Sequence, residues 1–363
     1  MRGFWAIASY CLLTSTLWAQ ADLKKGVTDL KDVDADFALQ GEYFGTTLHQ
    51  GCWRSCGLQV ACLGNGAFTG HFYPGGLPGW GYAGGEKIKV DGGYRSSGAE
   101  SPVELTGEGL RISLPAAGQP ATVYSLASGE TLGSLSKVTR VSPTMHALPP
   151  VQATVLFDGK NTDQLKNAKV NSEGNLEVGA ETVGAWKDFW LHAEFRTPYM
   201  PFATSQARGN SGFYLQRRYE VQVLDSFALD PQFNDSAALY RFKAPDFNMA
   251  FPPLTWQTYD IQFVSPRFSD DGKTRLTKGR ITVWHNGVVV QNNVELENKT
   301  GGGRPEGPEL LPILFQQHGN PVHFRNIWLL DQTPSVNPIA AAPSSTFQQP
   351  ISRREWRQYV RGR

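Results

Sequence analysis

The chain has little net charge and no long apolar run after its first residues. Its 363 residues include 34 Lys and Arg against 33 Asp and Glu, a formal net charge of +1. This balance gives no electrostatic reason to expect nucleic acid or an anionic membrane as a partner. A membrane-spanning helix needs about 20 consecutive apolar residues, and no later stretch supplies them, so we expect no transmembrane anchor.

Two catalytic signatures are also missing. No glycine-rich loop follows a strand and opens a helix, which argues against a nucleotide-dependent dehydrogenase. No Gly-x-Ser-x-Gly sequence is present, which argues against a serine hydrolase of the nucleophile-elbow type. The chain is instead rich in turn formers, with 38 Gly and 23 Pro, and 12% of its residues are aromatic. This composition is typical of a β-rich fold with many turns.

Cysteine is scarce. Cys11 lies in the N-terminal segment, and the others are Cys52, Cys56 and Cys62. In an oxidising compartment we expect one pair of these three to form a disulfide and to leave one thiol, but the sequence does not choose the pair. Zinc is the alternative, and we favour a disulfide because no histidine lies within the cluster.

The N-terminus has the pattern of a signal peptide. Arg2 is followed by an apolar run from Phe4 to Leu17 and by the small-x-small sequence Ala19-Gln20-Ala21. This pattern predicts removal of residues 1–21 and export of a bacterial protein to the periplasm or the extracellular space. Residues 22–36 then form a polar lead-in.

The rest of the chain divides into two β-rich regions and a tail. Residues 37–146 contain short apolar runs between glycine-rich turns, which predicts a small β-rich domain. A linker ends at Leu148-Pro149-Pro150, and strand patterns restart in residues 152–331. Residues 332–363 are rich in Pro, Ala and Ser and end in a basic run, so we expect a flexible tail.

Residues 152–331 show strand patterns without helical ones. Phe189–Arg196 and Trp256–Phe263 alternate apolar and polar side chains, and Asn286-Gly287 between apolar runs predicts a hairpin. Strands alone, over about 180 residues, indicate a two-sheet sandwich or jelly roll.

The segment Gly209–Asp225 concentrates the polar residues of chemical interest. It predicts a hairpin whose second strand places Glu220 and Gln222 on one face. Asp225 is out of step with this alternation, and a bulge near Leu224 would rotate it onto the same face.

Several segments, in this order and spacing, carry a family resemblance: Leu156-Phe157-Asp158-Gly159-Lys160, Glu194-Phe195-Arg196, Asn210-Ser211-Gly212-Phe213-Tyr214, Tyr219-Glu220-Val221-Gln222-Val223-Leu224-Asp225, His285-Asn286-Gly287-Val288, Gln316-Gln317-His318-Gly319 and Phe324-Arg325-Asn326-Ile327-Trp328. Together they make residues 152–331 resemble the bacterial 3-keto-disaccharide hydrolase family, also described as 3-keto-α-glucoside 1,2-lyase/3-keto-2-hydroxy-glucal hydratase. One departure is Gln317, where the family often has an acid.

The resemblance implies an all-β, concanavalin-like jelly-roll sandwich, here preceded by the small β-rich domain. It also implies chemistry on a sugar already oxidised at C3 by a separate sugar 3-dehydrogenase. The ketone acidifies the C2 proton, a base removes this proton, and the glycosidic oxygen leaves C1. Hydration of the resulting glycal can follow. The implied partner is therefore a 3-keto-glycoside substrate.

Glu220 and Asp225 are the expected catalytic acid/base pair, because such work needs positioned carboxylates with environment-tuned pKa values. The alternative is a structural ladder of hydrogen-bonded polar side chains. His318 follows Gln316 by two residues, so both can share a face. His318 is the third catalytic candidate: it could protonate the leaving oxygen, polarise the ketone, or bind a divalent cation with either acid. It could also only cap a turn.

Fixed donors stabilise negative charge that develops on an enolate, and aromatic rings can stack on sugars. The residues expected to contact substrate are Glu194, Arg196, Asn210, Gln222, Gln316, Arg325 and Trp256. No cofactor is implied with certainty, and the sequence leaves metal dependence open. A non-catalytic lectin is the competing function, and the acids with His318 favour the enzyme.

Overall fold

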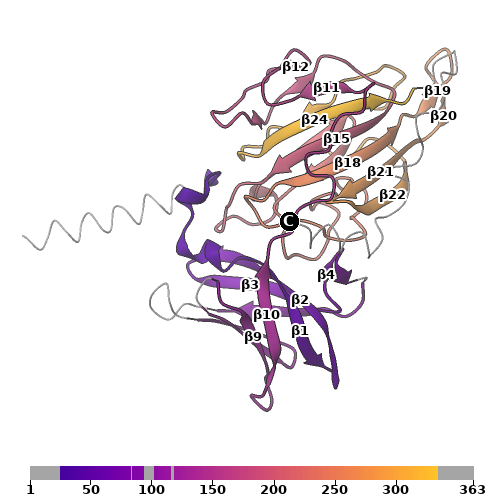
Figure 1. Cartoon of the computed structure of the whole chain (residues 1–363). Coiled ribbons are helices and arrows are strands. Elements are labelled where there is room, and N and C mark those ends of the chain that lie inside the picture. The colour runs from indigo at the N-terminus through magenta and orange to yellow at the C-terminus, as the bar shows by residue number, and fades with distance from the viewer. Residues whose placement is uncertain (1–24, 83, 94–101, 116–117, 334–363) are drawn as a thin grey trace, which may run out of the picture.

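The structure is a computed structural model that describes residues 25–82, 84–93, 102–115 and 118–333. Figure 1 shows a barrel, coloured indigo to magenta, beside a sandwich that runs to yellow. The all-β prediction is confirmed, because strands account for nearly all regular structure in these residues. The predicted signal peptide, Cys11 and nearly all of the predicted tail lie outside the described residues. Within these residues, no helix is long and apolar enough to span a membrane.

Eight antiparallel strands close the barrel in the order β1-β10-β9-β8-β7-β6-β3-β2. Their bounds are β1 (Gly41–His49), β2 (Cys52–Gly64), β3 (Ala67–Pro74), β6 (Ile88–Gly92), β7 (Val103–Gly107), β8 (Leu110–Leu114), β9 (Ala121–Ser125) and β10 (Thr131–Val138). A barrel of about eight strands has an interior that side chains can fill, and here a hydrophobic cluster fills it. The short strands β4 (Leu77–Pro78) and β5 (Gly81–Tyr82) lie beside it, and two 3-10 turns, η1 (Leu30–Asp32) and η2 (Ala35–Ala38), precede it.

The three cysteines of the barrel are free thiols, so the expected disulfide is not present. All three lie on the single strand β2. A strand rises about 3.3 Å per residue, so even Cys52 and Cys56 have Cα atoms about 13 Å apart, beyond the reach of a disulfide. Cys52 is exposed, whereas Cys56 and Cys62 are buried.

The sandwich has a seven-stranded and a five-stranded sheet. The first has the order β11-β24-β15-β18-β21-β22, with β13 paired to β24, and the second has the order β12-β14-β23-β16-β17. The bounds in the first sheet are β11 (Thr154–Phe157), β13 (Leu176–Glu177), β15 (Asp188–Arg196), β18 (Gln257–Val264), β21 (Gly279–His285), β22 (Val288–Leu296) and β24 (His323–Asp331). Those in the second are β12 (Leu165–Lys166), β14 (Glu181–Thr182), β16 (Ser211–Leu215), β17 (Tyr219–Val223) and β23 (Leu314–Phe315). A separate pair, β19 (Arg267–Phe268) and β20 (Arg275–Thr277), and the 3-10 turn η3 (Ser205–Ala207) complete the fold.

Alternation along each strand decides which side chains enter the core between the two sheets. Phe189, Leu191, Ala193 and Phe195 of β15 belong to the same hydrophobic cluster as Tyr219, Val221 and Val223 of β17. The intervening polar residues therefore point outward, on opposite sides of the sandwich. As predicted, Asn286-Gly287 forms the turn between β21 and β22, with φ of 50° and 77°.

Candidate active site

The predicted hairpin is present as β16 and β17. Tyr214 lies opposite Glu220 and Gly212 opposite Gln222, so these residues share the outer face of the five-stranded sheet. Gln216, Arg217 and Arg218 connect the two strands, and Gln216 and Arg217 have φ of 48° and 51°, the left-handed geometry that matches the twist of a hairpin. We call the outward-pointing set Tyr214, Glu220, Gln222 and Gln316 the polar face.

Glu220 is the most unusual group on the polar face. It is only 2% exposed, and its Oε2 has no hydrogen-bond partner within the protein. A Cβ placed on Gly212 would lie 2.6 Å from Oε1, so this glycine makes room for the carboxyl group. Burial raises the pKa of Glu220 to about 7, and a hydrogen bond with Tyr214 only partly offsets this.

Amide side chains extend the polar face beyond Glu220. Gln222 donates from Nε2 to Oε1 of Gln206 at 2.9 Å, and Asn210 donates from Nδ2 to the carbonyl of Gln206 at 2.7 Å. Gln316 donates from Nε2 to the Tyr214 hydroxyl at 3.4 Å. The side-chain oxygens of Asn210, Gln222 and Gln316 are buried without a protein donor. Buried acceptors of this kind are stabilised by donors such as sugar hydroxyls or water.

Asp225 is placed differently from the prediction. The β16–β17 pairing shows no register shift and ends at Val223, so the expected bulge near Leu224 does not form within this ladder. Asp225 instead lies beyond the strand, where its Oδ2 accepts a 2.7 Å bond from Nε of Arg208. Its Oδ1 accepts from the backbone N–H of Phe227 at 3.3 Å. Asp225 is therefore a buried, paired carboxylate, whereas Glu220 has no cation partner.

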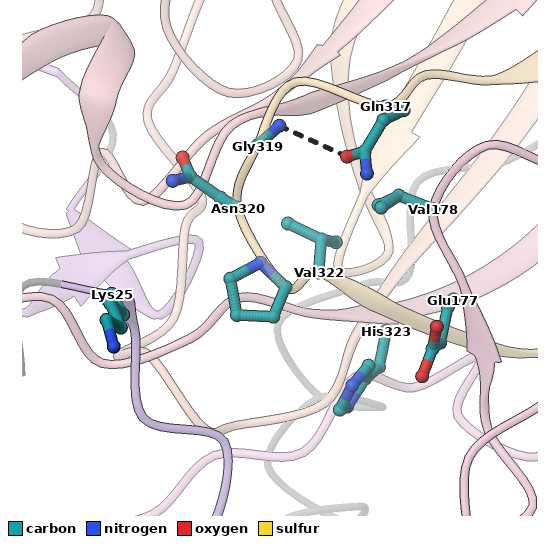
Figure 2. A pocket seen from close by; sticks show the side chains of 9 residues that line it. Lys25, Glu177, Val178, Gln317, Gly319, Asn320, Val322 and His323 are labelled. Carbon is teal, nitrogen blue, oxygen red and sulfur yellow. Dashed lines mark hydrogen bonds between the residues drawn. The ribbon is translucent and has the colours of Figure 1, made fainter. Parts of the chain in front are cut away.

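His318 is exposed on the segment that follows β23. Its neighbours Gln317 and Gly319 line an open pocket of about 320 Å³, and Figure 2 shows Lys25 on one side of it and Glu177 with His323 on the other. The pocket is lined by Lys25, Glu177, Val178, Gln317, Gly319, Asn320, Pro321, Val322 and His323. Asn320 also accepts from the backbone N–H of Asn210 at 2.7 Å, which connects this pocket to the end of the polar face.

Four of the predicted substrate contacts lie on the opposite side of the sandwich. Glu194, Arg196 and Arg325 belong to the outer face of the seven-stranded sheet, and Trp256 precedes β18 beside them. The guanidinium groups of Arg325 and Arg196 lie 4.0 and 5.1 Å from the centre of the Trp256 ring. The structure therefore does not bring these four residues together with Glu220.

Glu194 is fully buried there, at 0% exposure. Residues 140–148, which we call the strap, cross this face: the backbone N–H of His146 donates to Glu194 Oε1 at 2.6 Å, and Thr144 donates to Asp260 Oδ2 at 2.7 Å. Arg325 donates to Glu194 Oε2 at 2.7 Å. Burial alone would raise the pKa of Glu194, but these and other hydrogen bonds lower it to about 2. The strap and these hydrogen bonds therefore cover Glu194, on the opposite side of the sandwich from Glu220.

Several residues around the polar face were missed by the sequence reasoning. They are Gln206, Arg208, Tyr214 and Tyr240. The contacts of Gln206 with Gln222, of Arg208 with Asp225 and of Tyr240 with Glu220 depend on pairing between segments distant in sequence. Tyr214 alone had a local signal, because alternation on the first hairpin strand places it across from Glu220. Among the residues described, no group of three or more His, Cys, Asp or Glu is arranged to hold a metal ion.

Comparison with known proteins places these features in a family. Residues 152–330 match the family described as the 3-keto-alpha-glucoside-1,2-lyase-like domain. A solved structure from Parabacteroides distasonis ATCC 8503, described as a candidate glycosyl hydrolase, is 34% identical, with 50% of this chain and 84% of that chain covered and a TM-score of 0.46. Two further structures with the same description and source are 18% identical with TM-scores of 0.35; one comparison covers 50% of this chain and 94% of that one, the other 49% and 98%. No curated protein matches the chain.

The family match supports a carbohydrate-active enzyme. Through residues 152–330 the chain belongs to the 3-keto-alpha-glucoside-1,2-lyase-like family, as the motifs predicted.

Proposed function

We propose that this chain is an exported enzyme that cleaves 3-keto-glycosides by removing the C2 proton and eliminating the C1 substituent. One observation carries the proposal: Glu220 is a buried carboxyl group whose pKa is raised to about 7, on a face lined by unpaired amide oxygens. A general base works best when its pKa lies near the working pH, because it is then ionised and still basic enough to take a proton.

In the proposed reaction, the C3 ketone acidifies the C2 proton and the Glu220 carboxylate accepts it. The electron pair of the broken C–H bond forms the enolate, and its collapse breaks the bond between C1 and the glycosidic oxygen. The products are the freed alcohol and a 3-keto-2-hydroxy-glycal. Addition of water across the glycal double bond then gives net hydrolysis.

Other residues take supporting roles in this proposal. Burial raises the pKa of Tyr214, so its hydroxyl stays protonated and can donate a hydrogen bond at neutral pH. The amides of Asn210, Gln222 and Gln316 suit sugar hydroxyls, which both donate and accept. His318, exposed on the segment that follows β23, is proposed to protonate the departing oxygen, since a leaving group departs toward solvent. Asp225 holds Arg208 rather than acting as a second free acid.

A lectin is the second candidate, because the same unpaired amide oxygens would bind the hydroxyls of an unreacted sugar equally well. The raised pKa of Glu220 favours the enzyme, since a lectin gains nothing from a carboxyl group that titrates near neutrality. Export rests on the signal-peptide pattern of residues 1–21, and the ketone would be made by a separate sugar 3-dehydrogenase.

The test is incubation of purified protein with a 3-keto-glucoside and with its unoxidised parent, followed by product analysis. We expect release of the aglycone from the keto sugar alone. Equal cleavage of both sugars would indicate an ordinary glycosidase, and binding without turnover would indicate the lectin. Recovery from the periplasm of a chain that begins at Asp22 would test export.

A further inference from the structure

The β-barrel lies outside the family match, which begins at residue 152, yet it contacts two loops that reach the polar face. The first loop covers residues 197–210, between β15 and β16, and the second covers residues 224–238, after β17. We call them the first and second site loops. The first has one end on the barrel and the other beside Asp225, whereas the second contacts the barrel at Phe227 and Ala228 and has both ends beside Gln222 and Asp225.

The first site loop begins inside the barrel core. Tyr199 is fully buried in the barrel's hydrophobic cluster. Its backbone exchanges two hydrogen bonds with Val27, of 3.0 and 2.8 Å, and its hydroxyl donates to Asp34 at 2.9 Å. Phe202 packs on Gly64 at the end of β2, where even an added methyl group would overlap its ring. The barrel therefore fixes this loop through two aromatic side chains.

A few residues later the same loop supplies the partners of the polar face. Gln206 accepts from Gln222 at 2.9 Å and donates from Nε2 to the carbonyl of Asn234 at 2.8 Å. Arg208 pairs with Asp225 at 2.7 Å, and its carbonyl accepts from the Asp225 backbone N–H at 3.1 Å. The position of Phe202 thus limits where Gln206 and Arg208 can lie.

The second site loop is held by a neighbouring part of the barrel wall. Phe227 and Ala228 pack on Ala61 of β2 as a separate buried cluster. His71 of β3 donates from Nδ1 to the carbonyl of Ala228 at 2.9 Å, and Lys87 pairs with Asp230. Four residues beyond Asp230, the carbonyl of Asn234 meets Gln206 of the first loop. The two loops therefore join each other above Gln222, and the barrel holds both.

We propose that the barrel is a positioning module for the reaction, and that Tyr199 and Phe202 are positioning residues that fix Gln206 and Arg208 against Gln222 and Asp225. This inference rests on the proposed function for its catalytic consequence. A displacement of about 1 Å at a site can cost on the order of 100-fold in rate. Small shifts of the two site loops are therefore sufficient to slow the reaction.

The experiment compares Phe202→Ala with Ile112→Val in the full chain. Ile112 is buried in the same barrel core, but on β8, which is four strands away from β2 in either direction around the barrel. Both variants should lower Tm. We expect amide exchange at Asp225 and across residues 204–210 to speed up in Phe202→Ala only, and kcat/KM for a 3-keto-glucoside to fall about 10-fold or more in Phe202→Ala only. Phe202→Leu should restore much of the loss.

Equal exchange at these amides in both variants would overturn the inference. So would a kcat/KM that falls in proportion to the Tm loss in both. If Phe202→Ala does not fold, Tyr199→Phe, which keeps the ring and removes the hydroxyl that bonds Asp34 and the Cys62 thiol, should show a smaller change in the same direction. If the wild type turns over no keto sugar, the proposed function fails, and the exchange comparison still decides whether the barrel positions the loops.

Discussion

Arg208 donates from Nε to Oδ2 of Asp225 at 2.7 Å, and the two side chains are only 8% and 0% exposed. On the same hairpin, the Oε2 of Glu220 is buried with no hydrogen-bond partner in the protein. In the sequence Glu-x-Gln-x-x-Asp, Asp225 is therefore in an ion pair with Arg208, whereas Glu220 has no cationic partner. Replacing Asp225 by its amide should lower stability, and replacing Glu220 by its amide should lower the reaction rate.

Asp225→Asn should destabilise the protein by about 3–5 kcal/mol, because it leaves the buried Arg208 guanidinium without its counter-charge. Urea denaturation measures this loss. Asp271→Asn is the control, since Asp271 is exposed and its change should stay within about 0.5 kcal/mol. An Asp225→Asn variant as stable as the wild type would show that the ion pair contributes little.

Glu220→Gln should lower turnover of a 3-keto-glucoside by about 10²–10⁴-fold, the usual effect of removing a general base. Folding should be retained, because the neutral amide occupies nearly the same volume. In the wild type, kcat/KM should rise as pH increases through about 7, where the Glu220 carboxyl group ionises. Unchanged turnover in this variant would assign Glu220 to a structural ladder.

The same carboxyl group predicts how stability depends on pH. The pKa of Glu220 is about 7 in the folded protein against 4.5 ordinarily, so the folded state keeps a proton that the unfolded chain releases. Stability should therefore fall as pH rises from about 4.5 to 7, by at most about 3 kcal/mol, and Glu220→Gln should lack this component. Denaturation of both proteins at pH 5 and pH 8 measures the difference. Parallel pH curves would contradict the prediction.

We expect a His192 substitution to cause a second large loss of stability, at the strap. It is fully buried, and its Nδ1 lies 2.7 Å from Asp260. Burial lowers its pKa, but Asp260 and Glu194 outweigh this and raise it to about 9, so it is a buried cation between two acids. His192→Ala should cost about 3–5 kcal/mol and should expose residues 140–150 to proteases.

His146→Asn is the matched control for His192. The His146 side chain is 73% exposed, and its φ of 61° suits asparagine. Its backbone N–H would still reach Glu194. Equal protease sensitivity of the two variants would mean that His192 does not hold the strap.

The sequence predicts two separable domains, but Tyr199 and the strap cross between the barrel and the sandwich. A fragment of residues 152–331 would expose Tyr199 and leave Glu194 without the His146 bond. We expect it to aggregate or to lack a cooperative melt, and a fragment starting at residue 140 to be more soluble but less stable than the full chain. A residue 152–331 fragment that melts at the same temperature as the full chain would show that the sandwich is independent.

Local patterns predicted the hairpins well, because turn residues and alternation act within a few positions. Asn286-Gly287 and the outward direction of Glu220 both follow from such patterns. Alternation also placed Glu194 correctly on the outer face of its sheet. It could not show that the strap, which comes from a distant part of the sequence, covers that face. The Arg208–Asp225 pair was missed because Asp225 lies past the end of β17, where strand periodicity no longer gives a direction.

The order of strands has a consequence for synthesis of the chain. All barrel strands lie within residues 41–138, so they are made before the strands of the sandwich. In the seven-stranded sheet, however, β24 (His323–Asp331) lies between β11 and β15. Until these last residues emerge, β11 has no strand partner in this sheet and β15 has a free edge, which is a state prone to pairing with other chains. The sandwich is therefore exposed to wrong pairing until late in synthesis, after all barrel strands have been made.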